Sequence, residues 1–211
     1  GSGGFIGSQA APALSGAFSK LQCFTNNPET ARASGGRFLR TYMDFSSEGD
    51  IRRVVDSCGV PDVFVHLGWG AMEDPGSTEH LEKNVRDSNT LIETLFKAGL
   101  SRFVFLGSVN EYGARVGVLS EEMSAEGRMT NYAKGKALVA KFGFEKAAEL
   151  GKAFISIRLF NTYGSGQRGG SLINKLYRCH ATGTRAELGP CEHFRDYIHV
   201  SEVAEGIRRI S

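Results

Sequence analysis

Tyr132 and Lys136 stand four residues apart in the segment NYAKGK, on one face of a predicted helix. A phenol is a poor acid or base near neutral pH because its ordinary pKa is about 10, but a neighbouring ammonium group stabilises the phenolate and lowers that pKa. Ser108 ends a predicted strand, where ligands bind in open α/β sheets, and is placed to orient the same reacting oxygen. The three residues predict a proton-transfer site. For Tyr132 and Lys136 alone, the alternative is a solvated helix face.

The chain opens with GSGGFIG, a glycine turn of the kind that holds a pyrophosphate at the start of a helix. Gly1 and Gly4 permit a tight turn and close approach of the backbone to a ligand, and Gly7 lets the following helix pack on a sheet. Phe5 and Ile6 complete the turn and belong to the candidate dinucleotide site. Among 27 glycines, the same spacing also arises by chance or in a plain structural turn.

Short β-branched and aromatic runs alternate with longer amphipathic segments along the chain. Strands are expected at 21–27, 37–45, 61–70, 101–108 and 153–161, and helices at 50–59, 80–100, 131–151 and 171–183. This alternation predicts an α/β fold, with a Rossmann-like, doubly wound parallel sheet and helices on both faces. We expect a dinucleotide-binding domain over 1–163. The start of a small substrate lobe, partly interleaved with that domain, is expected over 164–211.

Composition excludes several classes of function. The 211 residues carry a formal charge of +2 and no long basic run, so there is no electrostatic reason to expect nucleic acid or an acidic membrane as a partner. No apolar run is long enough to span a bilayer. The four cysteines have neither CxxC nor metal-ligand spacing. We therefore expect reduced thiols, a cytoplasmic location and no metal site.

Eight segments in this order resemble motifs of the extended short-chain dehydrogenase/reductase superfamily, and in particular of the NAD-dependent epimerase/dehydratase family that acts on nucleotide sugars. The segments are GSGGFIG, MDF, VHLGWG, KNV, GSVNEYG, NYAKGK, RLFNTYGSGQ and RDYIHVSEVAEGI. The resemblance covers residues 1 to about 207 and is specific, because all eight motifs occur in the right order and spacing.

The resemblance implies catalytic roles for three residues. Tyr132 would be the acid and base acting on a sugar hydroxyl or ketone. Lys136 would lower the pKa of Tyr132 and bind the nicotinamide ribose, and Ser108 would hydrogen-bond the reacting oxygen. Hydride would pass between a sugar carbon and the nicotinamide.

The resemblance also assigns residues to the cofactor. Asp44 would bind the adenine amino group and Phe45 would flank the ring. Leu67 and Gly68 would line the cofactor cleft, and Asn84 would support the floor of the pocket. The alternative for Asp44 is a turn acid at a strand end. As isolated residues, Gly68 is more often a tight backbone approach and Asn84 a helix-face amide.

Substrate contacts are implied for Asn110, Asn161 and Arg195. Arg195 would make a charge-assisted contact to the diphosphate of a sugar nucleotide. The alternative for Arg195 is a structural ion pair with Asp196 or Glu202.

The end of the predicted strand 21–27, which corresponds to the second strand of the family, departs from the family pattern. The family usually has an acidic residue there for the adenosine ribose, whereas this chain has Thr25, Asn26 and Asn27. No carboxylate would repel a 2′-phosphate, and Arg32 lies near enough in sequence to attract one. We therefore expect NADP or NAD as the cofactor, with NADP slightly favoured and with Asn26 and Arg32 in its site.

The residues after Ser108 separate the reactions of the family. Dehydratases carry Asp-Glu directly after the serine or threonine, and this chain has Val109 and Asn110, so elimination of water loses its proton donors. Our first hypothesis is a 4-ketoreductase of a nucleotide 4-keto-6-deoxysugar, because a missing ribose acid suits a cofactor that is exchanged in each cycle. A nucleotide-sugar 4-epimerase is the alternative, and a non-catalytic dinucleotide-binding module is a third.

A glycine turn of this kind normally follows a buried strand, yet the turn opens the chain. We expect that the family's first strand and most of its substrate lobe are missing, and that these residues alone are marginally stable and poorly active, because neighbouring strands would keep unpaired backbone groups. When complete, the protein is expected to form a homodimer through the predicted helices 80–100 and 131–151.

Overall fold

The computed structural model describes residues 1–32, 38–167, 170–192 and 194–211, except for the side chains of Thr30 and Arg32. Its elements in chain order are α1 (Gly7–Ser15), β1 (Cys23–Thr25), α2 (Pro28–Arg32), β2 (Arg40–Tyr42), α3 (Glu48–Cys58), β3 (Val63–His66), α4 (Glu79–Lys97), β4 (Arg102–Leu106), the 3₁₀ turn η1 (Val109–Tyr112), α5 (Asn131–Leu150), β5 (Ala153–Ile157), β6 (Asn161–Tyr163), α6 (Leu172–Thr182), β7 (Tyr197–His199) and α7 (Val200–Ile210).

The strands pair in parallel, as the alternation of elements predicts. β3, β4 and β5 form one sheet, in which Val65, Val104 and Ile155 lie in register. β1 pairs with β2, and β6 pairs with β7, in two smaller parallel sheets. The predicted α/β class is therefore confirmed.

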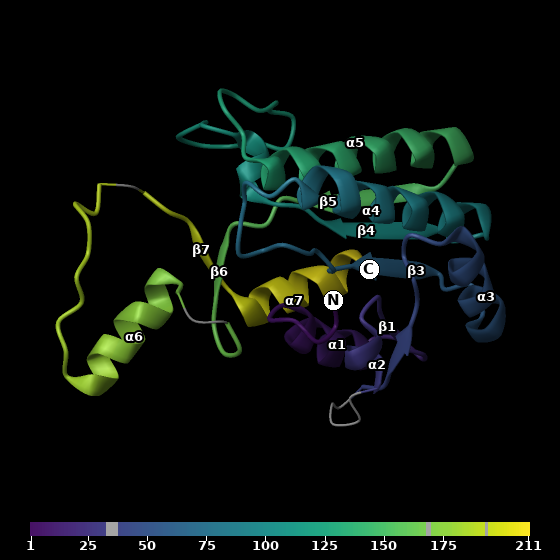
Figure 1. The fold of residues 1–211 in the computed structure, drawn as a ribbon, viewed down its shortest axis with the longest axis horizontal. Coiled ribbons are helices and arrows are strands. Elements are labelled where there is room, and N and C mark those ends of the chain that lie inside the picture. The colour runs from purple at the N-terminus through teal and green to yellow at the C-terminus, as the bar shows by residue number, and fades with distance from the viewer. Residues whose placement is uncertain (33–37, 168–169, 193) are drawn as a thin grey trace.

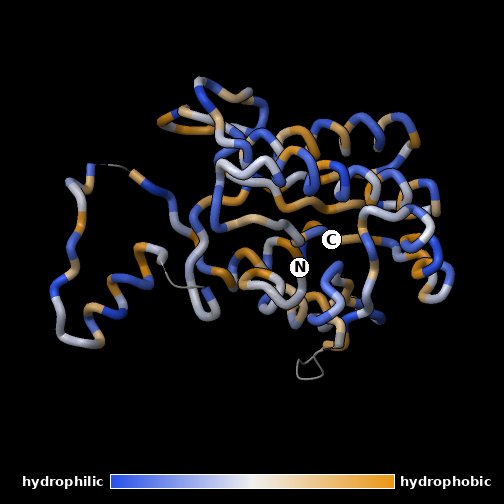
Figure 2. The backbone as a smooth tube through the Cα atoms, in the orientation of Figure 1, coloured by the Kyte–Doolittle hydropathy of each residue, from blue (hydrophilic) through white to orange (hydrophobic). Residues whose placement is uncertain are grey.

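Helices cover both faces of the strands, as a doubly wound sheet requires (Figure 1). On one face, α3, α4 and α5 pack through residues such as Ile51, Leu91 and Val139 against the aromatic side chains of β3, β4 and β5. On the other face, α1 and α7 pack together through Leu14 and Ile207. Figure 2 shows the hydrophobic residues concentrated along the central strands.

The parallel arrangement is interrupted between β1 and β3. Among the described residues, no strand pairs with the edges of β1 and β3 that face this interruption. A cavity of about 260 Å³ lies there, lined by both strands together with the glycine turn and α1. This cavity lies between β1 and β3, where the family's first strand is expected. That a strand is missing from the chain stays a prediction.

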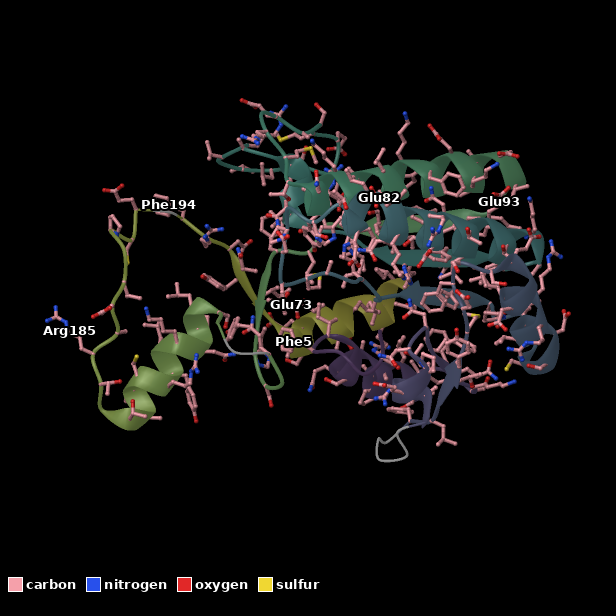
Figure 3. All side chains as sticks on the ribbon, in the orientation of Figure 1. Phe5, Glu73, Glu82, Glu93, Arg185 and Phe194 are labelled. Carbon is pink, nitrogen blue, oxygen red and sulfur yellow. The ribbon has the colours of Figure 1, made fainter. Side chains whose placement is uncertain are left out.

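The segment from β6 to β7 extends away from the other elements (Figure 1). α6 buries none of its residues, and Arg185 and Phe194 lie on the extended connection that follows it (Figure 3). Phe194 is fully exposed. After this segment, α7 packs against α1. The division into domains at residues 163 and 164 stays a prediction.

The predicted elements differ from the observed ones mainly at their ends. The strand expected at 153–161 divides into β5 and β6, because the chain beyond Ile157 bonds to the turn after β4, where the Val109 N–H donates to the Leu159 carbonyl (2.9 Å). β1 and β2 are shorter than expected, and α2, β7 and α7 were not expected. Within the described residues, no helix is both long and apolar enough to cross a membrane.

Candidate active site

Ser108 lies two residues after the end of β4, and a small turn holds it at the carboxyl end of that strand. Its Oγ accepts a hydrogen bond from the Asn110 N–H (3.2 Å), which caps η1, and its own N–H donates to Glu111 Oε1 (2.7 Å). The side chain is buried. A short capped turn therefore fixes the hydroxyl at the sheet edge.

The first turn of α5 carries Tyr132, and the next turn carries Lys136. Thr130 caps this helix by accepting from the Ala133 N–H (3.2 Å), and the Tyr132 N–H donates to the Pro75 carbonyl (3.0 Å). Because residues four apart share a helix face, Lys136 follows Tyr132 toward the end of β4. The Lys136 Nζ donates to the Leu106 carbonyl (2.7 Å).

Ser108, Tyr132 and Lys136 therefore come together, as the sequence predicts. Ser108 lies close enough to Tyr132 to act on its pKa, and the Lys136 Nζ lies 5.9 Å from the centroid of the Tyr132 ring. The groups come from two elements that meet at the carboxyl end of β4. This arrangement can hold and move a proton at an oxygen of a bound molecule.

The electrostatics differ from the sequence expectation. Burial raises the pKa of Tyr132, Ser108 acts in the opposite direction, and the charge of Glu111 adds to the increase. Burial lowers the pKa of Lys136 to about 7, while Glu111 opposes that decrease. The net shift of the Tyr132 pKa is therefore opposite to the expected one because of desolvation, and the effect of Lys136 on that pKa stays a prediction.

An aromatic wall beside Lys136 was not anticipated from the sequence. The Lys136 Nζ lies 4.0 Å from the centroid of the Trp69 ring, and the Trp69 Nε1–H donates to His80 Nδ1 (3.0 Å). Because an indole N–H can only donate, His80 Nδ1 accepts and Nε2 carries the proton that bonds the Asp74 carbonyl (2.9 Å). A tryptophan at a strand end, in VHLGWG, is the signal that could have indicated this wall.

Glu111 is the second residue that sequence reasoning missed. Its carboxylate is buried beneath Ser108, and Arg158 Nε lies 3.8 Å from its Oε2. Burial raises the pKa of Glu111, although the Ser108 N–H and Arg158 lower it. The sequence SVNE carries the S-x-x-E spacing of a capping box, which could have indicated this contact.

The glycine turn packs against the carboxyl end of β3. The Gly4 N–H donates to the Gly1 carbonyl (3.1 Å), and a Cβ on Gly1 would lie 2.7 Å from the Gly68 nitrogen and against the Leu67 backbone. A Cβ on Gly7 would meet the Gly1 carbonyl. Only glycine fits at these two positions, so the turn, with Phe5 and Ile6 before α1, can approach a ligand closely.

Two polar atoms at this turn support a phosphate-bearing ligand. Among the described residues, Ser2 Oγ and Arg40 Nε are buried without a hydrogen-bond partner. A hydroxyl and a guanidinium group next to exposed backbone amides are the donors that phosphate oxygens prefer. The residues present therefore fit a dinucleotide cofactor.

The other predicted cofactor residues have structural contacts of their own. Asp44 Oδ1 accepts from the Ser46 N–H (2.9 Å) and Oγ (2.7 Å), as its alternative as a turn acid would require. Phe45 is buried with its ring edge-on to His66 at 5.8 Å, and Asn84 bonds both backbone groups of Gly70 (3.2 and 3.1 Å). Their roles toward a cofactor stay predictions.

Of the residues predicted to lie near the adenosine ribose, the structure describes Asn26 and Asn27 in full. Asn26 is exposed at the end of β1, and Asn27 Oδ1 accepts from the Glu29 N–H (2.8 Å), which caps α2. The side chain of Arg32 lies outside the described part of the structure.

The predicted substrate residues lie in two places. Asn161 and Arg195 line one cavity of about 410 Å³ between β6, β7 and α6, and Asn110 is exposed on η1 beside Ser108. Asn161 Nδ2 donates to the Asp196 carbonyl (3.1 Å). In the described part of the chain, Arg195 makes no ion pair with Asp196 or Glu202, the pairing that was its alternative.

Comparisons with known proteins agree with this geometry. The chain is 34% identical over 149 residues to a UDP-glucose 4-epimerase of Erwinia amylovora, covering 61% of this chain and 44% of that protein. It spans about half the length of the curated relatives that it matches, 44% and 48%.

Two solved structures share the fold. A putative epimerase from Burkholderia cenocepacia J2315 is 25% identical, with a TM-score of 0.83 over 99% of this chain and 68% of that one. MoeE5 in complex with UDP-glucose and NAD is 26% identical, with a TM-score of 0.79 over 98% and 68%. The family model for the NAD dependent epimerase/dehydratase family matches residues 1–211. The chain therefore belongs to the NAD dependent epimerase/dehydratase family.

Proposed function

We propose that this chain acts in an NAD(P)-dependent 4-epimerase of a nucleotide-activated sugar. The observation that carries the proposal is the meeting of Ser108, Tyr132 and Lys136 at the carboxyl end of β4, beside the glycine turn. A bound NAD(P) would supply the acceptor and donor of the hydride. The glycine turn and the carboxyl end of β3 are the parts of this chain that would hold it.

The protein's task in this reaction is to move one proton at the sugar oxygen. Tyr132 takes the hydroxyl proton while the carbon loses hydride and becomes a carbonyl carbon, and it returns the proton when hydride comes back to the other face of the sugar. Ser108 hydrogen-bonds the same oxygen. The raised pKa of Tyr132 favours its role as a proton donor to the ketone. In the oxidation step the Lys136 ammonium would stabilise the phenolate, which is the role that the resemblance implies for Lys136.

Two features separate epimerisation from one-way reduction of a 4-keto sugar. The names of the relatives, UDP-glucose 4-epimerase and a putative epimerase, favour epimerisation. The absence of an acidic residue at Thr25–Asn27 favours a 4-ketoreductase of a nucleotide 4-keto-6-deoxysugar, the first hypothesis from the sequence, which becomes the second candidate.

We also propose a nucleotide-sugar contact through Asn161 and Arg195, which share a cavity. A homodimer through α4 and α5 is a further part of the proposal, since Leu138 and Phe144 expose apolar surface on α5. Light scattering that shows only monomer would contradict the dimer.

The test is an assay of the full-length protein with UDP-glucose and UDP-galactose in the presence of NAD or NADP. Interconversion without net change of the cofactor is the expected result. Stoichiometric oxidation of NADPH by a nucleotide 4-keto-6-deoxysugar would overturn the epimerase in favour of the reductase. Binding of the dinucleotide without either turnover would favour a non-catalytic module.

A further inference from the structure

We propose that Trp69 is a positioning residue whose ring holds the Lys136 ammonium group at the carboxyl end of β4. This inference rests on the proposed function and deepens it, because Lys136 is the residue through which Trp69 would act on turnover. The sequence patterns assign Trp69 no role, so the inference depends on contacts that only the structure shows.

The Lys136 ammonium group is buried among aromatic rings. One of its three N–H groups donates to the Leu106 carbonyl (2.7 Å). The Nζ lies 4.0 Å from the centroid of the Trp69 ring and 4.8 Å from that of Phe105. Glu111 acts on Lys136 through its charge, but in the described part of the chain no carboxylate forms an ion pair with Lys136. The ring faces therefore do part of the work of a counter-ion, because they attract a cation electrostatically.

The Trp69 ring is itself held in one orientation. Its Nε1–H donates to His80 Nδ1 (3.0 Å), and the two rings stack with an interplanar angle of 14°. Asn84 Nδ2 lies 3.3 Å from the same His80 nitrogen, and the Asn84 side chain also bonds both backbone groups of Gly70, the residue after Trp69. Both the ring and the adjacent backbone of Trp69 are thus anchored to α4.

A glycine next to Lys136 makes room for this ring. A Cβ on Gly135 would lie 3.2 Å from Trp69 Cζ2 and 2.5 Å from the His80 carbonyl oxygen. A side chain at position 135 would therefore push the ring and α4 away from α5. Gly135 belongs to the segment NYAKGK, so the segment that carries Tyr132 and Lys136 also admits Trp69.

A fixed ammonium group matters because the lysine side chain is flexible and carries a compact charge. The charge can act on Tyr132 reproducibly only if its position is fixed, and in this structure the Nζ lies 5.9 Å from the centroid of the Tyr132 ring. The Trp69 ring stands edge-on to the Tyr132 ring at 6.3 Å, so it contacts both members of the pair. Without the Trp69 ring, the ammonium group would be free to move toward water and away from the phenol.

The test is a double-mutant cycle in the turnover of the full-length protein. Trp69→Leu removes the ring and keeps an apolar side chain, and Trp69→Phe keeps an aromatic face without the indole N–H. Each is measured in the unaltered protein and in Lys136→Met. Phe96→Leu is the matched control, because the buried Phe96 ring packs against Phe103 (6.2 Å between centroids) and, within the described residues, makes no cation–π contact with Lys136.

We expect Trp69→Leu to lower kcat at least about tenfold, as for a displaced group near the reacting atoms, and to change KM for the nucleotide sugar less than about twofold. Trp69→Phe should retain most of the turnover. In Lys136→Met, Trp69→Leu should change kcat less than about twofold, because the group that Trp69 positions is gone. Phe96→Leu should leave kcat unchanged.

A second cycle, in stability, tests the contact without turnover. At pH 6 Lys136 carries its charge, since burial lowers its pKa only to about 7. Urea unfolding at this pH should show that Trp69→Leu destabilises the unaltered protein more than it destabilises Lys136→Met, because only the unaltered protein loses an ammonium–ring contact. Should Trp69→Leu not fold, Trp69→Met, which fills the space with a flexible apolar chain, takes its place in both cycles.

Three outcomes would overturn the inference. Equal loss of kcat on Trp69→Leu in both backgrounds would mean that Trp69 acts without Lys136. Equal loss in Trp69→Phe or in Phe96→Leu would mean that packing, and not the aromatic face beside Lys136, supports turnover. Equal destabilisation in both backgrounds would remove the contact itself. If the unaltered protein turns over no nucleotide sugar while the stability cycle shows coupling, the proposed function fails and the hold of Trp69 on the ammonium group stands.

Discussion

The β3–β4–β5 part of the molecule and the β1–β2 part are packed very differently. In the first, the rings of Phe64, Phe103 and Phe154 stack across the three strands with centroids 5.4 and 5.8 Å apart. In the second, both strands have three residues, and the edge of β1 faces a cavity of about 260 Å³. One part is a continuous aromatic core, and the other has an open edge.

The two parts also carry different groups of candidate site residues. Ser108 follows β4, and Tyr132 and Lys136 lie on α5, in the packed part, whereas the candidate adenosine residues Asn26 and Asp44 follow β1 and β2. Proton transfer depends on geometry held within a fraction of an ångström, while holding the far end of a cofactor tolerates local motion. The comparison suggests that rigidity is concentrated where the reacting atom would lie.

The largest expected difference between the two parts is in stability. Phe103→Ala should lower the free energy of unfolding by about 3–5 kcal/mol, because its ring is fully buried and leaves a cavity. Phe24→Ala, on β1 at the existing cavity, should cost clearly less, since its ring is only partly buried. Urea unfolding of both variants measures the difference. Equal costs would show that the β1–β2 part is as tightly packed as the other.

A second prediction concerns chemistry on the packed part. Tyr132→Phe keeps the ring against Trp69 and His80 but removes the only atom on that ring that moves a proton. Turnover of a nucleotide sugar should fall about 10²-fold or more, the usual loss for a general acid or base. Affinity for the dinucleotide, measured by titration, should stay within about twofold. Near-normal turnover would mean that Tyr132 only packs against Trp69 and His80 and takes no part in proton transfer.

Lys136 gives the packed part a characteristic pH dependence. Burial lowers its pKa from 10.5 to about 7, so between these values the unfolded chain binds a proton that the folded chain does not. Stability from this residue is therefore fully present above pH 10.5 and is lost as the pH falls to 7. Between pH 7 and pH 9, the free energy of unfolding of the unaltered chain should rise by about 2 kcal/mol more than that of Lys136→Met.

Thermal or urea unfolding of the two proteins at both pH values measures this gain, because taking the difference cancels the titration of other groups. If the difference in free energy of unfolding between the two proteins is the same at pH 7 and pH 9, Lys136 stays charged in the folded chain. In that case, the cation–π contact with Trp69 would outweigh desolvation.

The sequence predicted those parts of the site that depend on local spacing. Tyr132 and Lys136 share a helix face because they are four residues apart, and Ser108 follows a strand that its own residues specify. Arg40 beside Gly3, and Trp69 beside His80, depend on side chains that meet across separate elements, which spacing cannot give. The short strand β7 was missed for the same reason, because its partner β6 lies more than thirty residues away.

The smallest expected effect concerns Glu111, whose carboxylate accepts a hydrogen bond from the Ser108 N–H. Glu111→Gln keeps the shape of the side chain and an oxygen that can accept from the Ser108 N–H, but it removes the charge. A hydrogen bond to a charged acceptor is stronger than one to a neutral acceptor, but burial raises the pKa of Glu111, so the cost of desolvating the charge exceeds the gain from that bond. Stability should therefore rise slightly, by roughly 1 kcal/mol or less. Glu122→Gln, on an exposed residue of the following loop, is the matched control and should leave stability unchanged.

The same substitution should also act through Lys136. Since the charge of Glu111 raises the pKa of Lys136, Glu111→Gln should lower that pKa below its value of about 7 and leave less ammonium at higher pH. Turnover should therefore fall more at pH 8 than at pH 6, with little change at either pH in Glu122→Gln. A loss of turnover that is independent of pH would mean that Glu111 only holds the Ser108 turn. A loss of stability would mean that the hydrogen bond from the Ser108 N–H returns more than the desolvation of the carboxylate costs.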